Sequence, residues 1–180
     1  MRKLIHEEVV NRQKNRNKQP RLPFAVVLNN IRSLYNVGSI FRTSDGAMIQ
    51  KLILTGYTPY PPRKEIEKTA LGSTKSVKWE YFKDPLEAIQ LLKEQGIKLC
   101  CLELTDKSIP HYNVQPSDFP LCLVIGNEIV GVSTNIISLC DMAVEIPMYG
   151  IKQSLNVAVA YGVAVFELTR IWRIHNGIVE

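Results

Sequence analysis

The chain has 180 residues, of which 46% are hydrophobic, and its 22 basic and 17 acidic side chains give a formal net charge of +5. This length and composition fit one globular domain with a sizeable core and leave little room for two. No apolar run is long enough to span a membrane, and the first residues lack the apolar centre of a signal peptide, so we expect a cytoplasmic protein.

The basic charge is concentrated at the N-terminus. Residues 1–21 hold seven Lys or Arg and two Glu, a net charge of +5, whereas residues 22–180 balance at 15 basic and 15 acidic side chains. Lys and Arg gain affinity for a polyanion by releasing its counterions. A basic arm over 1–21 ahead of a neutral domain over 22–180 therefore indicates contact with phosphates, and a solvated, mobile terminus is the alternative.

Short strand patterns alternate with helical patterns through the rest of the chain. Apolar runs typical of buried strands lie at 24–28, 52–54, 98–104, 121–125 and 142–146. Helical patterns lie at 37–47, 84–95 and 133–140, and residues 55–83 form a long connection with a short helix. The alternation predicts an α/β fold with a mostly parallel sheet flanked by helices.

The C-terminal part carries a long apolar segment directly after two polar residues. Ser154 and Asn156 precede a run from Val157 that has strand propensity. The run continues through Trp172, which is too long for one strand and favours a helix starting near Ser154. Its many alanines predict close packing on several faces.

Several common motifs are excluded. The four cysteines lie in apolar runs without CxxC spacing, which indicates reduced core residues rather than metal ligands. The segment GNEIVGVS has the glycine spacing of a phosphate loop, but Val132 stands where that loop requires lysine. No GxGxxG follows the first strand, and the three histidines lie outside the polar clusters described next.

Three polar clusters each follow a predicted strand, and open α/β sheets bind ligands at the carboxyl ends of their strands. The clusters are 29–46, which holds Asn36 and Arg42, 126–128, which ends at Glu128, and Ser154 with Asn156. Taken singly, Asn36 and Ser154 are typical helix caps and Glu128 is typical of a first helical turn. Arg42 is either a structural ion-pair partner or a residue whose forked guanidinium binds a phosphate or carboxylate.

Together the clusters resemble the three sequence motifs of the SpoU (TrmH) family of RNA ribose 2′-O-methyltransferases. The first reads NIRSLYNVGSIFRT, the second LVIGNEIVGVS and the third IPMYGIKQSLNVAVA, in the family's order over residues 30–160. The resemblance covers essentially the whole domain. Three motifs at family-like spacing, each after a strand, make coincidence improbable.

The resemblance implies a SPOUT fold, in which the C-terminal part is threaded into a trefoil knot that binds S-adenosyl-L-methionine (AdoMet). It implies functional roles for Arg42, Asn36, Glu128, Ser154 and Asn156, and cofactor contacts for Leu104, Gly126, Ile146, Leu155 and Met148. It also implies a homodimer in which the C-terminal helix joins the interface and Arg42 completes a site across it. No metal is required.

The reaction that the resemblance implies requires alignment of the ribose with the methyl donor and removal of a proton. AdoMet supplies an activated methyl group, so the protein has to place a ribose 2′-hydroxyl in line with it and help remove the proton. A guanidinium is a poor base because its pKa exceeds about 12. Our hypothesis is that Arg42 grips the RNA phosphate beside the target ribose, whereas a family proposal makes Arg42 itself the base.

The substrate predicted from the resemblance is RNA, with tRNA favoured over rRNA. Many family members carry a separate RNA-recognition domain, and this chain has only the short basic arm. We expect the arm and the tyrosine-rich connection at 55–83 to hold the RNA backbone and to stack on an exposed base. The alternatives are an rRNA 2′-O-methyltransferase and a non-catalytic RNA-binding protein with the SPOUT scaffold.

Overall fold

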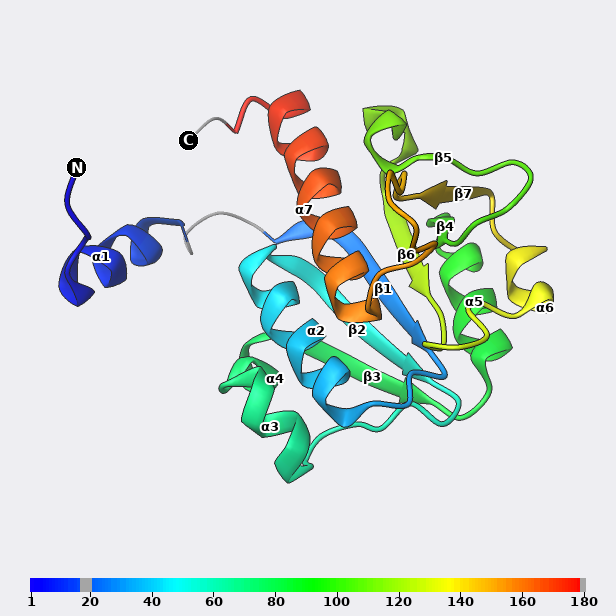
Figure 1. Ribbon diagram of the computed structural model, residues 1–180, viewed down its shortest axis with the longest axis horizontal. Coiled ribbons are helices and arrows are strands. Elements are labelled where there is room, and N and C mark those ends of the chain that lie inside the picture. Colours follow the sequence, from blue (N-terminus) through cyan, green and yellow to red (C-terminus); the bar gives the residue numbers. More distant parts are fainter. Residues whose placement is uncertain (17–20, 179–180) are drawn as a thin grey trace.

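The computed structural model describes residues 1–16 and 21–178, which form a seven-stranded sheet with helices on both faces (Figure 1). The strands are β1 (Leu22–Asn29), β2 (Ile49–Thr55), β3 (Lys78–Phe82), β4 (Lys98–Leu102), β5 (Ile109–Pro110), β6 (Leu121–Ile125) and β7 (Met142–Glu145). The helices are α1 (His6–Arg16), α2 (Leu34–Gly46), α3 (Lys64–Ala70), α4 (Ser73–Ser76), α5 (Pro85–Glu94), α6 (Thr134–Ile137) and α7 (Val157–His175), with 3₁₀ turns η1 (His111–Asn113) and η2 (Pro116–Asp118).

All paired strands are parallel and follow the order β3-β2-β1-β6-β4-β7-β5, which confirms the predicted fold class. The chain winds outward from β1 to β3 and then crosses to the other half of the sheet, where β6 lies between β1 and β4. Because the strands are parallel, the loops after β1, β4, β6 and β7 emerge at the same edge. The implied trefoil knot stays a prediction.

Two strands are missing from the sequence prediction. β3 lies at the edge of the sheet with two of its five residues half-buried and the others exposed, so it lacks the apolar run of a buried strand. β5 has only two residues, one of them a proline. The predicted connection at 55–83 therefore contains α3, α4 and an edge strand rather than one short helix. The strands predicted at 98–104 and 142–146 end earlier, at Leu102 and Glu145.

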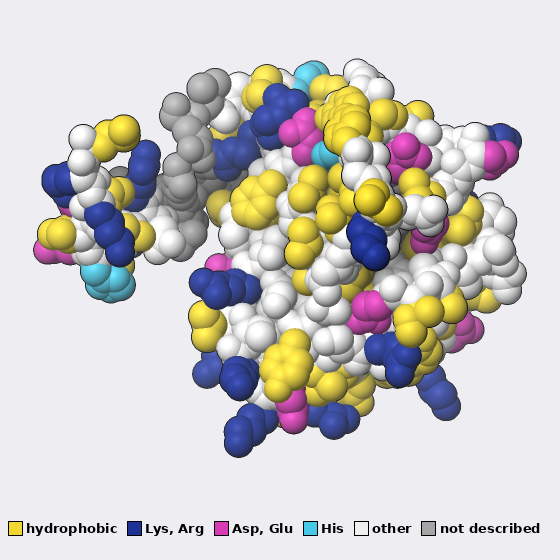
Figure 2. Space-filling model, viewed as in Figure 1, with side chains coloured by type: hydrophobic (Ala, Val, Ile, Leu, Met, Phe, Trp, Pro, Cys, Tyr) yellow, Lys and Arg dark blue, Asp and Glu magenta, His cyan; other side chains and the backbone are white. Residues whose placement is uncertain are grey.

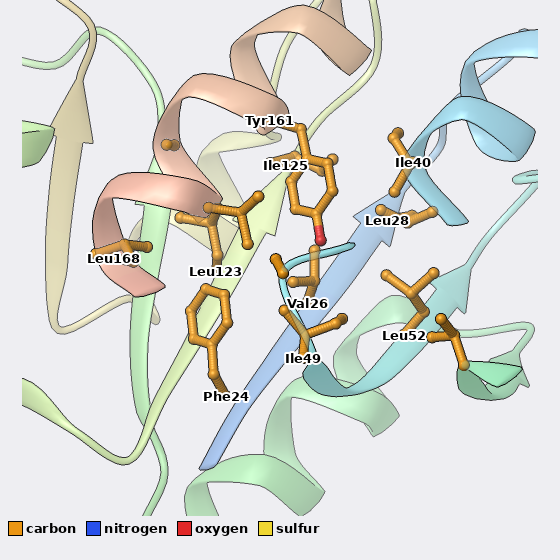
Figure 3. Packing of buried hydrophobic residues seen from close by; sticks show 14 of the residues in the cluster. Phe24, Val26, Leu28, Ile40, Ile49, Leu52, Leu123, Ile125, Tyr161 and Leu168 are labelled. Carbon is orange, nitrogen blue, oxygen red and sulfur yellow. The ribbon is translucent and has the colours of Figure 1, made fainter. Parts of the chain in front are cut away.

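The core consists of two layers of side chains, one on each face of the sheet. Alternate residues of β1 point to opposite faces, so Phe24 and Val26 join the layer that includes α2 and α7, while Ala25 and Val27 join the layer of α5 and α6. Figure 3 shows Tyr161 of α7 pointing into the first layer above β1. This double coverage explains why β1 and β6 are continuous apolar runs.

The two helices that carry motif residues lie side by side on one face of the sheet (Figure 1). The hydroxyl groups of Tyr161 in α7 and Ser44 in α2 share a buried hydrogen bond of 2.7 Å. α2 begins at Leu34, two residues before Asn36, and its N-cap is Ser33, which accepts a hydrogen bond from the Asn36 backbone N–H. The expectation that Asn36 caps this helix is therefore wrong, and its side chain is left for another role.

One side of α7 is uncovered. The helix is capped by Asn156, whose Oδ1 accepts a hydrogen bond from the Ala158 N–H at 3.0 Å. Val159, Val163 and Phe166 are 53%, 40% and 51% exposed. They recur at helical spacing and form an apolar stripe. Within this chain, α7 is thus covered on one side and not on the several faces that its composition predicts.

The cysteines behave as the sequence predicts. All four are free, and Cys100, Cys101 and Cys122 are buried in the core layers. Burial raises the pKa of Cys122 to about 12, so its thiol is protonated and unreactive at neutral pH.

The basic arm contains a helix that the sequence analysis does not predict. α1 spans His6–Arg16 and stands apart from the sheet in Figure 1. The last part of the arm, 17–20, lies outside the described residues, and the boundary between 21 and 22 stays a prediction. Among the described helices, none is long and apolar enough to cross a membrane.

Gly38 allows α2 and α3 to approach closely, and we expect Gly38→Ala to destabilise the protein. A Cβ at this position would lie 2.1 Å from Thr69 Oγ1 and 2.3 Å from the Ile66 carbonyl oxygen. Overpacking of this kind costs about 1–3 kcal/mol. Urea unfolding should show a lower midpoint for Gly38→Ala, whereas Gly46→Ala, which meets only Phe166 at 3.5 Å, should unfold like the parent. Equal midpoints for both variants would contradict the proposed close packing.

Candidate active site

A pocket of about 210 Å³ opens at the carboxyl ends of β4, β6 and β7. Four segments line it, from the loops after these strands and from the first turn of α7. These are Leu102–Leu104, Ile125–Ile129 with Gly131, Glu145 with Ile146 and Met148, and Gln153–Leu155 with Val157 and Ala160. The position matches the general rule that parallel sheets bind ligands where their strands end.

Seven of the ten residues singled out from the sequence line this pocket. They include all five expected cofactor contacts, together with one residue each from the second and third motifs. The seven are Leu104, Gly126, Ile146, Leu155, Met148, Glu128 and Ser154. Asn36, Arg42 and Asn156 are not among the described lining residues.

The Glu128 carboxylate joins the second motif to the first, and Asn36 extends the connection to the third. It accepts hydrogen bonds from the backbone N–H groups of Arg32 and Ser33 at 2.9 and 3.0 Å, and from Asn36 Nδ2 at 2.9 Å. Asn36 Oδ1 in turn accepts a hydrogen bond from Asn156 Nδ2 at 3.3 Å. Asn36 and Asn156 therefore lie outside the pocket lining and connect Glu128, at the loop after β6, to the start of α7.

Acidification is expected to weaken this network. Partial burial raises the pKa of Glu128, but hydrogen bonds from Arg32, Asn36 and Ser33 outweigh it, so the folded-state pKa lies below the ordinary 4.5. A carboxylate with a depressed pKa stabilises the fold above its unfolded-state pKa, and this contribution is lost as the pH falls through the folded-state value. The free energy of unfolding should therefore be higher for the parent than for Glu128→Gln at pH 7, and the difference should shrink on titration toward pH 3. A difference independent of pH would contradict this role.

The loop after β6 is fixed from both sides, by its own Asn127 and by Glu103, which the sequence analysis did not single out. On one side, Asn127 Nδ2 donates to the Asn30 carbonyl and to the Tyr57 hydroxyl, both at 3.0 Å. On the other side, Glu103 Oε2 accepts a hydrogen bond from the Val132 N–H at 3.0 Å. Glu103 follows β4 as Glu128 follows β6, and a polar residue just past an apolar run was the available signal for it.

Arg42 stands apart from the other motif residues. It lies six residues after Asn36 on α2, which places it about 120° away around the helix axis. Its side chain is exposed, and no hydrogen bond or ion pair involves it among the described residues. The sequence left two interpretations of Arg42, a structural ion-pair partner or a group that binds a phosphate or carboxylate. The described residues give no support to the ion pair, so the guanidinium is available to an external anion.

Comparison with known proteins shows to which family this chain belongs. Residues 23–166 match the SpoU rRNA Methylase family. The chain belongs to this family. A tRNA (guanosine(18)-2′-O)-methyltransferase from Aquifex aeolicus (strain VF5) is 32% identical over 171 residues, which cover 93% of this chain and 75% of that protein. The predicted enzyme class, an RNA ribose 2′-O-methyltransferase, is confirmed, and so is the predicted parallel-sheet architecture of SpoU methylases.

Solved structures of RNA-modifying enzymes have the same architecture. The crystal structure of the A. aeolicus TrmH/SpoU tRNA modifying enzyme matches with a TM-score of 0.80 at 30% identity, covering 94% of this chain and 87% of that one. An AdoMet-bound rRNA methyltransferase from Sinorhizobium meliloti matches with a TM-score of 0.77 at 27% identity, covering 84% of this chain and 56% of that one.

Proposed function

We propose that this SpoU methylase binds AdoMet in the pocket at the carboxyl ends of β4, β6 and β7 and methylates a ribose 2′-hydroxyl of tRNA. The proposal rests on one observation. Residues of the second and third motifs line the same pocket, and the first motif is hydrogen-bonded to Glu128 of the second. A tRNA substrate agrees with the name of the A. aeolicus relative and would place the enzyme in the cytoplasm.

The residues of the pocket fit AdoMet. Apolar side chains such as Ile125, Ile146 and Leu155 offer contacts to an adenosyl group. Glu103, Glu128 and Glu145 are among the lining residues, and the described lining contains no Lys or Arg. This excess of acidic over basic residues around the pocket favours a ligand with a sulfonium and an ammonium group. When bound, AdoMet supplies the methyl group, and the protein supplies alignment and proton removal.

We propose Arg42 as the RNA-gripping residue, acting across a homodimer interface. The apolar stripe of Val159, Val163 and Phe166 on α7 is exposed beside α2, which carries Arg42. Burying this stripe against a second copy would remove the apolar surface from water. It would also bring Arg42 toward a pocket other than its own. There, the guanidinium fork would hold the phosphate beside the target ribose and favour transfer of the hydroxyl proton to that phosphate as the oxygen takes the methyl group.

Ser154, Asn36, Glu128 and Asn156 are proposed as positioning groups. Ser154 lines the pocket directly. The hydrogen-bonded path from Glu128 through Asn36 to Asn156 fixes the loop after β1 and the start of α7 relative to the cofactor. Such support holds reacting groups in alignment without contact to the substrate.

Transfer of labelled methyl from AdoMet tests the proposal. Total tRNA and, separately, rRNA are incubated with the enzyme and digested to nucleosides. A labelled 2′-O-methylnucleoside from tRNA supports the proposal, and one from rRNA alone supports the alternative that the AdoMet-bound S. meliloti rRNA enzyme represents. AdoMet binding without transfer to either RNA would favour the non-catalytic RNA-binding protein.

A further inference from the structure

A cluster of exposed tyrosines lies beside the pocket, at the carboxyl ends of β2 and β3. Tyr57, Tyr60 and Tyr81 are 59%, 44% and 37% exposed. Tyr57 and Tyr60 belong to the loop after β2, and Tyr81 belongs to the edge strand β3. Exposed aromatic rings in this number are unusual for a solvated surface and indicate contact with a partner.

The rings of this cluster are held in place by the core. The Tyr60 ring lies 4.5 Å from that of Tyr81 and stacks on Trp79 at 6.2 Å with an interplanar angle of 29°. Trp79 in turn meets the buried ring of Phe41 edge-on at 6.5 Å. Aromatic pairs at these separations are attractive. Tyr60 is therefore braced from beneath while nearly half of its surface faces solvent.

Hydrogen bonds tie the cluster to the pocket loop. The Tyr81 hydroxyl donates to the Gly56 carbonyl at 2.6 Å, and the Tyr57 N–H donates to Asn30 Oδ1 at 3.2 Å. The Tyr57 hydroxyl accepts a hydrogen bond from Asn127, which lines the pocket. The hydroxyl groups of Tyr57 and Tyr81 are thus occupied within the protein, so a ligand would meet these residues through the exposed parts of their rings.

The surroundings of the tyrosines are basic. Residues 55–84 carry six basic and four acidic side chains. Arg63, Lys64 and Lys83 are exposed, and none forms an ion pair within the described residues. Of the acidic groups, Glu80 pairs with Lys51 at 3.1 Å. Figure 2 shows Lys and Arg side chains along the edge of the molecule formed by α3 and α4, where α3 begins directly after the tyrosine loop and α4 lies at the amino end of β3. Aromatic rings among cations are typical of a surface that binds single-stranded nucleic acid.

The spacing fits a short stretch of RNA. β3 is three strands away from β6, whose loop forms the pocket, and neighbouring strands lie about 4.8 Å apart. The strand ends are therefore separated by roughly 14 Å, which corresponds to about four stacked nucleotides at about 3.4 Å each.

We propose that Tyr60 and Tyr81 form a stacking platform for an unpaired base of the RNA, a few nucleotides from the ribose that is methylated. This inference rests on the proposed function, from which it takes the identity of the RNA. It adds that the RNA is held at the tyrosine cluster and is single-stranded at that point. Sequence-tolerant stacking would supply affinity, while the pocket selects the reacting ribose.

Tyr60→Ala is expected to weaken RNA binding without affecting the cofactor site. Loss of a base–aromatic stack costs about 1–3 kcal/mol, so KM for tRNA should rise by about 5- to 150-fold, with kcat at saturating RNA and AdoMet affinity unchanged. Tyr60→Phe, which keeps the ring, should restore the parent KM. Tyr112→Ala removes another exposed tyrosine, at η1, and should have no effect. Melting temperatures and AdoMet titrations confirm that each variant is folded.

Direct binding separates failure of this inference from failure of the proposed function. A single-stranded oligoribonucleotide containing 2-aminopurine should be quenched on binding by the parent and by Tyr60→Phe, and not by Tyr60→Ala. Equal RNA affinity and quenching for parent and Tyr60→Ala would overturn the platform even if methyl transfer is observed. Quenching that depends on Tyr60 would support it even if neither RNA is methylated. A duplex that binds the parent as tightly as the single strand, with no loss in Tyr60→Ala, would also overturn it.

Discussion

Arg42→Ala is expected to lower the methyl-transfer rate by about 10²–10³-fold while leaving AdoMet affinity unchanged. The rate should fall because a donor that stabilises charge in the transition state is removed. AdoMet affinity should not change because Arg42 is absent from the described lining of its own chain's pocket. Single-turnover transfer to tRNA and AdoMet titration give the two quantities. Near-normal turnover of Arg42→Lys would argue against a role for the guanidinium fork, since a point charge does not reproduce it.

Mixing two inactive variants tests whether Arg42 acts across the interface. Arg42→Ala and Ser154→Ala each damage one half of the proposed site. If a site takes Arg42 from one subunit and Ser154 from the other, half of the randomly mixed dimers contain one intact site, and about a quarter of the parent rate should return. No recovery, despite subunit exchange seen by native mass spectrometry, would place Arg42 and Ser154 in the same subunit's site.

Gly126→Ala is expected to abolish AdoMet binding. A Cβ on Gly126 would lie 2.2 Å from the Gly131 carbonyl carbon and 2.3 Å from the Val132 nitrogen. These are backbone atoms of the pocket loop, which is held on its other side by Glu103, so it has to shift as a unit. The distortion should also cost about 1–3 kcal/mol of stability. Isothermal titration with AdoMet and urea unfolding measure the two effects.

Gly150→Ala is the matched control for Gly126→Ala. Gly150 lies in the third motif, and a Cβ there would meet nothing within 4 Å. The variant should bind AdoMet like the parent. If Gly126→Ala also binds AdoMet normally, the pocket at the ends of β4, β6 and β7 is not the cofactor site.

The sequence located the sheet where its strands are buried on both faces. The apolar run at 121–125 coincides with β6, because a central strand covered by helices on both sides is apolar at every position. β3 was missed because an edge strand is half-solvated and lacks the continuous apolar run that identified the buried strands, although its alternation of polar and aromatic residues is typical of a half-buried strand. The helix in the basic arm was also missed, because its polar sequence lacks the apolar periodicity on which helix prediction rests.

The roles of individual motif residues depended on tertiary contacts. Asn36 has the sequence of a helix cap, yet Ser33 holds that position and the Asn36 side chain binds Glu128 and Asn156. Glu128 lies 92 residues from Asn36, so no local pattern predicts their hydrogen bond. Arg42 shares a motif with Asn36, and only the helical turn between them shows that the two face different directions.

The sequence by itself determined the fold class and the family, and it singled out the candidate site residues, since apolar periodicity and motif spacing are properties of the chain read in order. The tertiary structure alone decided that Glu128 joins the motifs, that seven of the ten residues share one pocket, and that an apolar stripe on α7 and a braced tyrosine cluster remain uncovered. These features arise when a parallel sheet brings distant strand ends to one edge. Distances between residues on different strands cannot be read from the order of residues in the chain.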